Sequence, residues 1–292
     1  MNPDTLIPGQ VVAAHGRNYL VECAEQRVLS CVTRGKHSDI ACGDRVAVHA
    51  TGPDQGVIEA ADPRSTVFLR SAAHRRKLIA ANLSQVAILV AVEPSFSDEL
   101  IARVLVAAEH AQLKTLILLN KADLDTGPAL ARLEPFAQAG HRLLTLSALR
   151  DVTPLRDLLL GETTALVGQS GMGKSTLVNT LFPGAGAATR EISAFLDSGR
   201  HTTTSVRLYR LDGSSALIDC PGLQEFGLAH LAPGDIEWGF VEFRPWLGQC
   251  RFPDCRHARE PGCAIAAATA EGRIHPRRLD LYRRIAAAEG RR

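Results

Sequence analysis

One glycine-rich stretch limits what this chain can fold into more than any other. Residues 168–176 read Gly-Gln-Ser-Gly-Met-Gly-Lys-Ser-Thr and fit the pattern G-x-x-x-x-G-K-[ST]. They lie between an apolar run at 165–167 and a helix-like run at 177–181. Strand, loop and helix in that order predict a phosphate-binding P-loop, because glycines let successive backbone N–H groups turn inward around phosphate oxygens. The alternative, a glycine-rich surface turn, does not account for the flanking strand and helix.

The residue types within this loop predict individual contacts. We expect Lys174 to reach the β- and γ-phosphates, and the short hydroxyl of Ser175 to bind Mg²⁺, which prefers oxygen ligands. The loop as a whole is expected to contact a nucleotide through Gly168, Gln169, Ser170, Gly171, Met172, Gly173, Lys174, Ser175 and Thr176.

A second motif predicts which base is bound. Asn120-Lys121-Ala122-Asp123 follows an apolar run and matches the N-K-x-D motif of GTPases. A carboxylate at Asp123 can accept hydrogen bonds from the guanine N1–H and exocyclic amine, whereas adenine lacks that pair of donors. Ser147-Ala148, at the end of the next predicted strand, resembles the loop that contacts guanine O6. The sequence therefore predicts GTP and GDP as ligands.

Two further segments are expected to complete the magnesium site. Asp219-Cys220-Pro221-Gly222 is a D-x-x-G motif, in which Asp219 would hold Mg²⁺ through water and the Gly222 N–H would meet the γ-phosphate. Upstream of it, a threonine of the run Thr202, Thr203 and Thr204 can sense the γ-phosphate. The run does not reveal which threonine does so, and Thr204 could serve only to begin the next strand. The ligand set that we adopt is Ser175, Thr203 and Asp219.

Catalysis is expected to need help from elsewhere. Leu223 follows Gly222, where many GTPases carry a glutamine that orients the attacking water. Because an apolar side chain cannot align water, we expect slow intrinsic turnover. His201 and Arg200 are candidates for this role, although exposed loop residues are an equally good interpretation of both. The catalytic set that we adopt is His201, Lys174 and Asp219.

The order of the motifs is itself informative. In an ordinary GTPase the P-loop precedes the switch segments and N-K-x-D comes later, but here Asn120 and Ser147 precede Gly168. The domain is therefore predicted to be circularly permuted, which a site defined by spatial positions tolerates. One consequence is that the D-x-x-G segment leads directly into the C-terminal region. A movement that depends on the bound nucleotide could then reach that region.

The residues before the nucleotide motifs predict a small β-barrel. Five short apolar stretches, at 9–13, 19–23, 28–32, 45–49 and 56–60, are separated by turn signals, and five strands favour an OB-fold. Such barrels often bind oligonucleotides, and residues 34–37 (Arg-Gly-Lys-His) could touch phosphate, although a solvated loop is the simpler interpretation. A basic connector, Arg70–Lys77, then leads to the apolar run Val86–Val92, which predicts a strand buried on both faces.

The C-terminal region carries a metal-binding pattern. After a predicted helix at 234–243, Cys250, Cys255, His257 and Cys263 form C-x4-C-x-H-x5-C, which predicts one closed, structural Cys₃His zinc site. Four unliganded residues would leave this loop without a core. Arginines surround the ligands and continue along a predicted helix at 276–287, which favours a phosphate-contacting surface: Arg251, Arg256, Arg259, Arg277, Arg278, Arg283 and Arg284.

Composition places the chain among globular proteins. Apolar residues make up 46% and charged residues 22%, and no apolar run approaches the roughly 20 residues of a membrane span. Met1–Asp4 lacks the features of a signal peptide, so we expect a cytoplasmic protein with no membrane partner. Four scattered cysteines are expected to be buried thiols rather than disulfide partners: Cys23, Cys31, Cys42 and Cys220.

Taken together, these motifs resemble the ribosome small-subunit-dependent GTPase A family, RsgA or YjeQ, across essentially the whole chain. The resemblance implies an OB-fold barrel at 1–68, a circularly permuted α/β P-loop GTPase domain at 69–232 and a mostly helical zinc-binding domain at 233–292. It further implies a monomeric GTPase that acts in late maturation of the 30S subunit, binds 16S rRNA and is stimulated by that subunit. By the same resemblance, a histidine that takes part in hydrolysis corresponds to His201. The alternative function is a regulatory guanine-nucleotide-binding protein with a non-ribosomal RNA partner.

Overall fold

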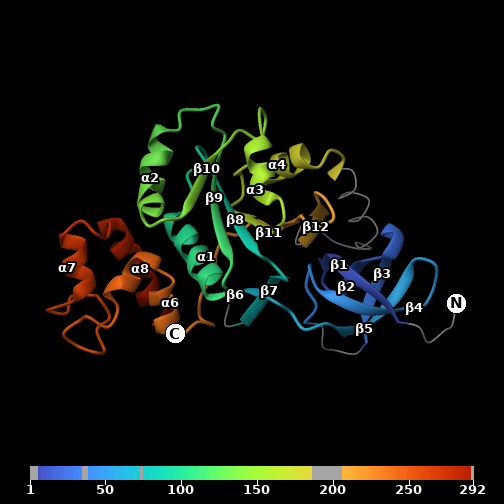
Figure 1. The fold of residues 1–292 in the computed structure, drawn as a ribbon, viewed down its shortest axis with the longest axis horizontal. Coiled ribbons are helices and arrows are strands. Elements are labelled where there is room, and N and C mark those ends of the chain that lie inside the picture. The colour runs from blue at the N-terminus through green and yellow to red at the C-terminus, as the bar shows by residue number, and fades with distance from the viewer. Residues whose placement is uncertain (1–5, 35–38, 73–74, 186–205, 291–292) are drawn as a thin grey trace.

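The computed structural model describes residues 6–34, 39–72, 75–185 and 206–290. Figure 1 shows three parts in a row: a β-barrel, a central sheet flanked by helices, and a helical C-terminal region. The predicted contacts of Arg200, His201 and the three threonines at 202–204 lie outside the described residues, as do those of residues 35–37.

The N-terminal barrel has the five strands that the sequence predicts. They pair in the order β1-β2-β3-β5-β4, and β4 pairs again with β1, which closes the barrel. Alternate side chains such as Val11, Val21 and Val48 fill its interior and are fully buried. The OB-type barrel is thereby confirmed, with strands β1 (Ile7–His15), β2 (Asn18–Cys23), β3 (Val28–Thr33), β4 (Arg45–Ala50) and β5 (Gln55–Ala61).

The predicted basic connector is instead a β-hairpin, made of β6 (Val67–Ala72) and β7 (Arg75–Ala81). Buried apolar residues hold it in place, because Phe68 lies 5.7 Å from Phe226, measured between ring centroids. Ser71 also exchanges two backbone hydrogen bonds with Gly227, of 2.9 and 3.2 Å. The basic residues between 70 and 77 led to the prediction of a connector, because they gave no sign of the apolar contacts that the hairpin makes.

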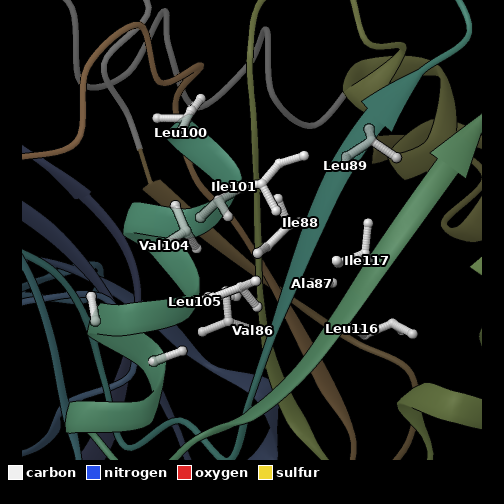
Figure 2. Close-up of a cluster of buried hydrophobic side chains, with 14 of the residues drawn as sticks. Val86, Ala87, Ile88, Leu89, Leu100, Ile101, Val104, Leu105, Leu116 and Ile117 are labelled. Atoms are coloured by element: carbon white, nitrogen blue, oxygen red, sulfur yellow. The ribbon is translucent and has the colours of Figure 1, made fainter. Parts of the chain in front are cut away.

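The central sheet is built from five parallel strands and one antiparallel edge strand, β12, with α1 packed on one face. Every residue of β8 is buried, and Figure 2 shows Leu100, Ile101, Val104 and Leu105 of α1 lying against it. The expected strand buried on both faces is confirmed. The strand order is β10-β9-β8-β11-β13-β12, from β8 (Gln85–Ala91), β9 (Lys114–Asn120), β10 (Arg142–Thr145), β11 (Thr163–Gly168), β12 (Val206–Arg210) and β13 (Ala216–Asp219). Its helices are α1 (Asp98–His110), α2 (Gly127–Gln138), α3 (Thr153–Leu159), which the sequence analysis missed, and α4 (Lys174–Leu181).

The barrel and the central sheet are continuous. Strand β12 pairs antiparallel with β1, with Arg207 opposite Ala13, so that a single sheet of 11 strands runs through both parts. Arg210 reinforces the junction through a 2.5 Å hydrogen bond from its Nε to Glu22. This pairing covers the edge of β12 and the end of β1 that lies beyond its pairing with β4.

The C-terminal region is helical, but its first helix is shorter than predicted. The helix expected at 234–243 ends at Trp238 and is followed by a 3₁₀ turn. Gly239 separates the two, and it packs so closely on α1 that a Cβ there would lie 2.8 Å from Val106 Cγ1. The elements are α6 (Pro233–Trp238), η2 (Val241–Trp246), α7 (Ala264–Ala270), which was not predicted, and α8 (Pro276–Glu289). None of the described helices is long and apolar enough to cross a membrane.

Charged contacts dock α8 on the central domain and correct one expectation. Arg278, predicted to lie on a phosphate-contacting surface, is only 1% exposed. Its Nε donates a 2.5 Å hydrogen bond to Glu242, and its guanidinium lies 4.9 Å from the centroid of the Phe136 ring on α2. Arg277 pairs with Asp98 at 3.1 Å, so these two arginines stabilise the contact between the helices rather than face solvent together.

Candidate functional site

The P-loop has the predicted strand, loop and helix. Strand β11 ends at Gly168 and α4 begins at Lys174, and the loop between them has positive φ at Gly171 (82°) and Gly173 (87°). A Cβ at Gly173 would lie 2.4 Å from Nδ2 of Asn120, so glycine is required there for space as well as for backbone conformation.

This loop borders a cavity of about 700 Å³. The cavity brings together three of the predicted segments, because Lys121 of the N-K-x-D motif and Asp219 and Gly222 of the D-x-x-G motif line it as well. The P-loop lining consists of Gln169, Ser170, Gly171, Gly173, Lys174, Ser175 and Thr176. Met172 is buried beneath the loop instead, with 1% of its surface exposed.

Lys174 and Asp219 form an ion pair inside the cavity. Burial raises the pKa of Asp219, while the neighbouring Lys174 acts in the opposite direction. The ammonium group is therefore already in the cavity, where it can exchange the carboxylate for phosphate oxygens.

The D-x-x-G segment is fixed against the P-loop through its backbone. Leu223 donates a 2.9 Å hydrogen bond from its N–H to the carbonyl of Gly168, and its side chain is only 3% exposed. A Cβ on Gly222 would lie 3.7 Å from the amide nitrogen of Ser170. The side chain after Gly222 thus packs in the core and presents no polar group to the cavity.

The predicted base-reading residues are also in contact with one another. Asn120, 2% exposed, donates from Nδ2 to the carbonyl of Met172 and accepts from the Ala148 N–H, each at 2.9 Å. Ser147 donates a 2.6 Å hydrogen bond to Asp123, and this bond is the main reason why the pKa of Asp123 is lowered. Asp123 is therefore a carboxylate at neutral pH, as an acceptor for guanine donors must be.

Five residues that line this cavity were not predicted as site residues: Val178, Asn179, Arg207, Tyr209 and Pro221. Arg207 lies directly opposite Asp219 in the antiparallel pairing of β12 and β13. Directly opposed residues project from the same face of a sheet, which brings this cation to the side of the sheet that carries Asp219. The sequence indicates that successive side chains of β12 point to opposite faces of the sheet. It does not indicate which of them share the face of Asp219, because that depends on the register with β13.

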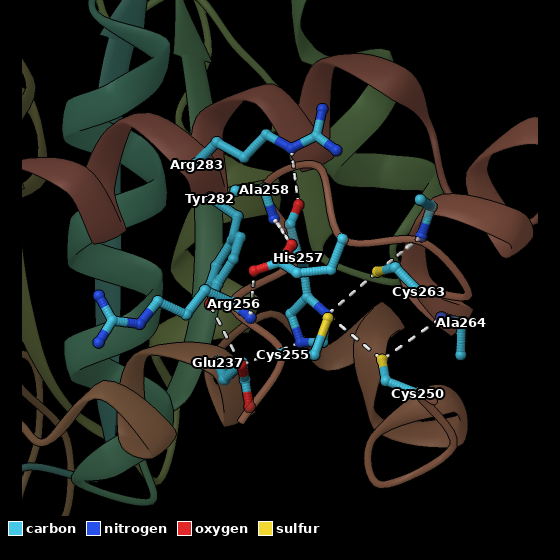
Figure 3. Close-up of polar contacts among 12 residues, drawn as sticks. Glu237, Cys250, Cys255, Arg256, His257, Ala258, Cys263, Ala264, Tyr282 and Arg283 are labelled. Atoms are coloured by element: carbon cyan, nitrogen blue, oxygen red, sulfur yellow. Dashed lines mark hydrogen bonds and ion pairs between the residues drawn. The ribbon is translucent and has the colours of Figure 1, made fainter. Parts of the chain in front are cut away.

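The four predicted zinc ligands converge in the C-terminal region. One ligand atom from each of Cys250, Cys255, His257 and Cys263 lies within 4.8 Å of the others, and Figure 3 shows the three sulfurs around the His257 ring. Nδ1 of His257 is 3.6, 3.6 and 3.3 Å from the sulfurs of Cys250, Cys255 and Cys263. A tetrahedral zinc site with ordinary bond lengths requires N···S separations of about 3.6 Å, so these donors fit the ion.

The surroundings orient these donors. Glu237 lies 2.9 Å from Nε2 of His257, which leaves Nδ1 facing the sulfurs. Burial raises the pKa of Cys255 to about 12, so its thiolate form would need a bound divalent cation to stabilise it. Arg283 donates from Nε to the carbonyl of His257 at 2.8 Å, which ties the loop to α8.

Comparison with known proteins gives a consistent result. The model of the RsgA GTPase family matches residues 61–229. A protein of Nitrosospira multiformis is 53% identical over 96% of this chain and 90% of its own, and one of Nitrosomonas europaea is 49% identical over 96% and 91%. Both carry the name small ribosomal subunit biogenesis GTPase RsgA.

Two solved structures are similar along nearly the whole chain. YjeQ from Thermotoga maritima has a TM-score of 0.75 at 28% identity and covers 99% of this chain and 100% of its own. YloQ, described as a circularly permuted GTPase, has a TM-score of 0.70 at 24% identity, covers 99% of this chain and 96% of its own, and supports the fold alone.

Proposed function

The chain belongs to the RsgA GTPase family, and from that premise we propose that it binds the small (30S) ribosomal subunit, assists its late maturation and hydrolyses GTP faster when bound to it. The observation that carries the proposal is a relative with this name that is 53% identical over 96% of the chain. The cavity lined by the P-loop together with Lys121, Asp219 and Gly222 supports the catalytic part.

For the nucleotide, we propose that the P-loop backbone and Lys174 hold the phosphates and that Asp123, with Asn120, Lys121, Ser147 and Ala148, binds guanine. Ser175 and Asp219, together with Thr203, would hold Mg²⁺, which offsets charge on the β- and γ-phosphates when bound. His201 and the threonines at 202–204 remain part of this proposal, although they lie outside the described residues.

Dependence on a partner follows from the buried Leu223. Because its side chain is 3% exposed and apolar, it cannot orient the attacking water. Lys174 can stabilise negative charge on the phosphates, but nothing at position 223 deprotonates or aligns the nucleophile. We propose that the ribosomal subunit completes this arrangement, directly or by positioning His201.

The C-terminal cluster is proposed to hold one structural Zn²⁺, because its four donors leave no open coordination position. We expect chelation to unfold the loop 250–263 and to loosen the helices α7 and α8 beside it, since this loop has little core without the ion. Zinc release measured with a chromogenic chelator should coincide with loss of hydrogen-exchange protection in α7 and α8. Protection of β8 and β9 is the internal control. Unchanged exchange in α7 after complete zinc release would contradict a structural role.

We further propose that the chain acts as a cytoplasmic monomer in contact with 16S rRNA. The division into parts at 1–68, 69–232 and 233–292 also remains a proposal. The hairpin β6–β7 begins at Val67 and lies at the first of these boundaries.

The decisive experiment compares GTP turnover of the purified protein alone, with 30S subunits and with 50S subunits. We expect an increase of at least about tenfold with 30S subunits only, since partner-supplied groups contribute factors of this size or more. Equal turnover in all three reactions would contradict the ribosomal function while leaving the GTPase activity intact. Stimulation by a non-ribosomal RNA alone would favour the alternative function.

A further inference from the structure

The zinc-cluster loop carries exposed arginines without acidic partners. Arg251, Arg256 and Arg259 are exposed, and no ion pair joins any of them to a carboxylate within the described ranges. Two nearby carboxylates are already engaged: Glu237 with His257 and Tyr282, and Glu260 with the loop backbone. Asp254 is the remaining acid between residues 251 and 259, so this part of the loop has a net positive charge.

Hydrogen bonds to one carboxylate hold the backbone of the loop that carries these arginines. The Glu260 carboxylate accepts hydrogen bonds from three backbone N–H groups, those of Arg256 (3.0 Å), Ala258 (2.8 Å) and Arg259 (3.0 Å). These bonds lower the pKa of Glu260 to about 2, so the cap persists at every physiological pH. Together with the four converging ligands, the cap fixes where the arginine side chains leave the backbone.

An aromatic ring lies on the same loop. Phe252 is 39% exposed, although it is a large apolar residue next to a folded core. The Arg251 guanidinium lies 5.6 Å from the centroid of its ring, a cation–π contact that orients the ring without burying it. Proteins bind single-stranded nucleic acid by stacking bases on exposed aromatic rings and pairing phosphates with cationic side chains, and this loop offers both groups.

We propose that residues 251–259, which we call the arginine loop, bind an unpaired stretch of RNA, with a base stacked on Phe252 and backbone phosphates at Arg256 and Arg259. The proposal rests on the proposed function, since the RNA would belong to the small subunit. Beyond the proposed function, the inference names the loop that contacts the RNA and specifies that the bound RNA is single-stranded. Double-stranded RNA keeps its base faces within the stack and is a poorer ligand for an exposed ring.

The test uses full-length protein with a bound non-hydrolysable GTP analogue. Fluorescence anisotropy measures its affinity for a short labelled oligouridylate and for an RNA duplex of the same length. We expect the single strand to bind more tightly and Phe252→Ala to weaken it by about 5- to 150-fold, the range for loss of one stacked base. Phe252→Tyr should retain wild-type affinity, whereas Phe252→Leu, which keeps apolar volume without a π face, should behave like Phe252→Ala.

Salt dependence separates the phosphate contacts from the ring. Arg256→Gln should reduce the slope of log affinity against log salt by about 0.7, the value for one phosphate contact on a single strand, while Phe252→Ala leaves the slope unchanged. Arg142→Gln, at an exposed position of β10 outside the loop, is the matched control and should change neither quantity. Zinc content and basal GTP turnover of each variant establish that it is folded.

Several outcomes would overturn the inference. These are absence of single-strand binding by the wild type, equal binding of strand and duplex, or wild-type affinity in Phe252→Ala. Weaker binding of Phe252→Ala to 30S subunits with unchanged binding to both RNAs would place a ribosomal protein at the ring and likewise overturn it. In each case, the effect of 30S subunits on GTP turnover by the wild-type enzyme still tests the proposed function independently of these binding results.

Discussion

Replacing Asp123 by asparagine will change the base preference from guanine to xanthine, with the ratio of GTP to XTP affinities falling by about 10⁴-fold, the scale for sites built around paired hydrogen bonds. The proposed carboxylate accepts from the N1–H and the exocyclic amine of guanine. An amide presents an N–H₂ group toward that amine, whereas it can donate to the carbonyl that xanthine carries at the same position. Competition against a fluorescent GDP measures both affinities, and turnover of XTP tests whether the phosphate site still works.

A matched change separates base recognition from the position of the side chain. Ser147→Ala removes the 2.6 Å hydrogen bond to Asp123 but leaves the carboxylate. We therefore expect weaker GTP binding with unchanged preference for GTP over XTP. If Asp123→Asn retained the GTP preference of the wild type, Asp123 would not be the base-reading residue.

Replacing Lys174 by alanine is expected to reduce GTP turnover by at least about 10²- to 10³-fold, the usual loss on removal of one charged or hydrogen-bonding group from a transition state. In the structure this ammonium pairs with Asp219 inside the cavity. The variant therefore also leaves the Asp219 carboxylate buried without its partner. Single-turnover hydrolysis at saturating GTP measures the chemical step, and GDP affinity measures ground-state binding.

The control for Lys174 is Lys114→Ala. Lys114 is 69% exposed at the start of β9 and pairs with Glu162, so its removal should leave turnover unchanged. Turnover by Lys174→Ala within about twofold of the wild type would mean that the P-loop lysine does not act on the phosphates, contrary to the mechanism proposed for this loop.

Most of the candidate site could be predicted because its parts are local. The P-loop, N-K-x-D, D-x-x-G and Cys₃His patterns each occupy a few consecutive or closely spaced residues. Their spacing expresses requirements of backbone conformation and ligand chemistry that do not depend on distant neighbours. The five barrel strands and the buried strand β8 were predicted for a similar reason, since the pattern of apolar residues along a strand indicates which of its faces are buried.

Errors occurred where a residue's environment depends on distant partners. The charges of residues 70–77 suggested a connector, yet Phe68 packs on Phe226 and a hairpin forms. Arg278 was expected at the surface but is 1% exposed, because Glu242 and the Phe136 ring meet it between α2 and α8. Neither contact can be predicted from the residues that are close in the sequence.

By itself, the amino-acid sequence predicted the chemistry proposed for this protein: a phosphate loop, a guanine-selective carboxylate and a Cys₃His set. The permuted order of the motifs can also be read directly from the sequence. Only the tertiary structure decided how the parts are joined. Strand β12 pairs with β1 and merges the barrel with the central sheet, and Ser71 pairs with Gly227 beyond the D-x-x-G segment. The physical reason is that hydrogen bonds between strands are made by backbone groups that nearly all residues share. Motifs can therefore be recognised in the sequence, whereas the pairing of strands that are distant in the sequence cannot.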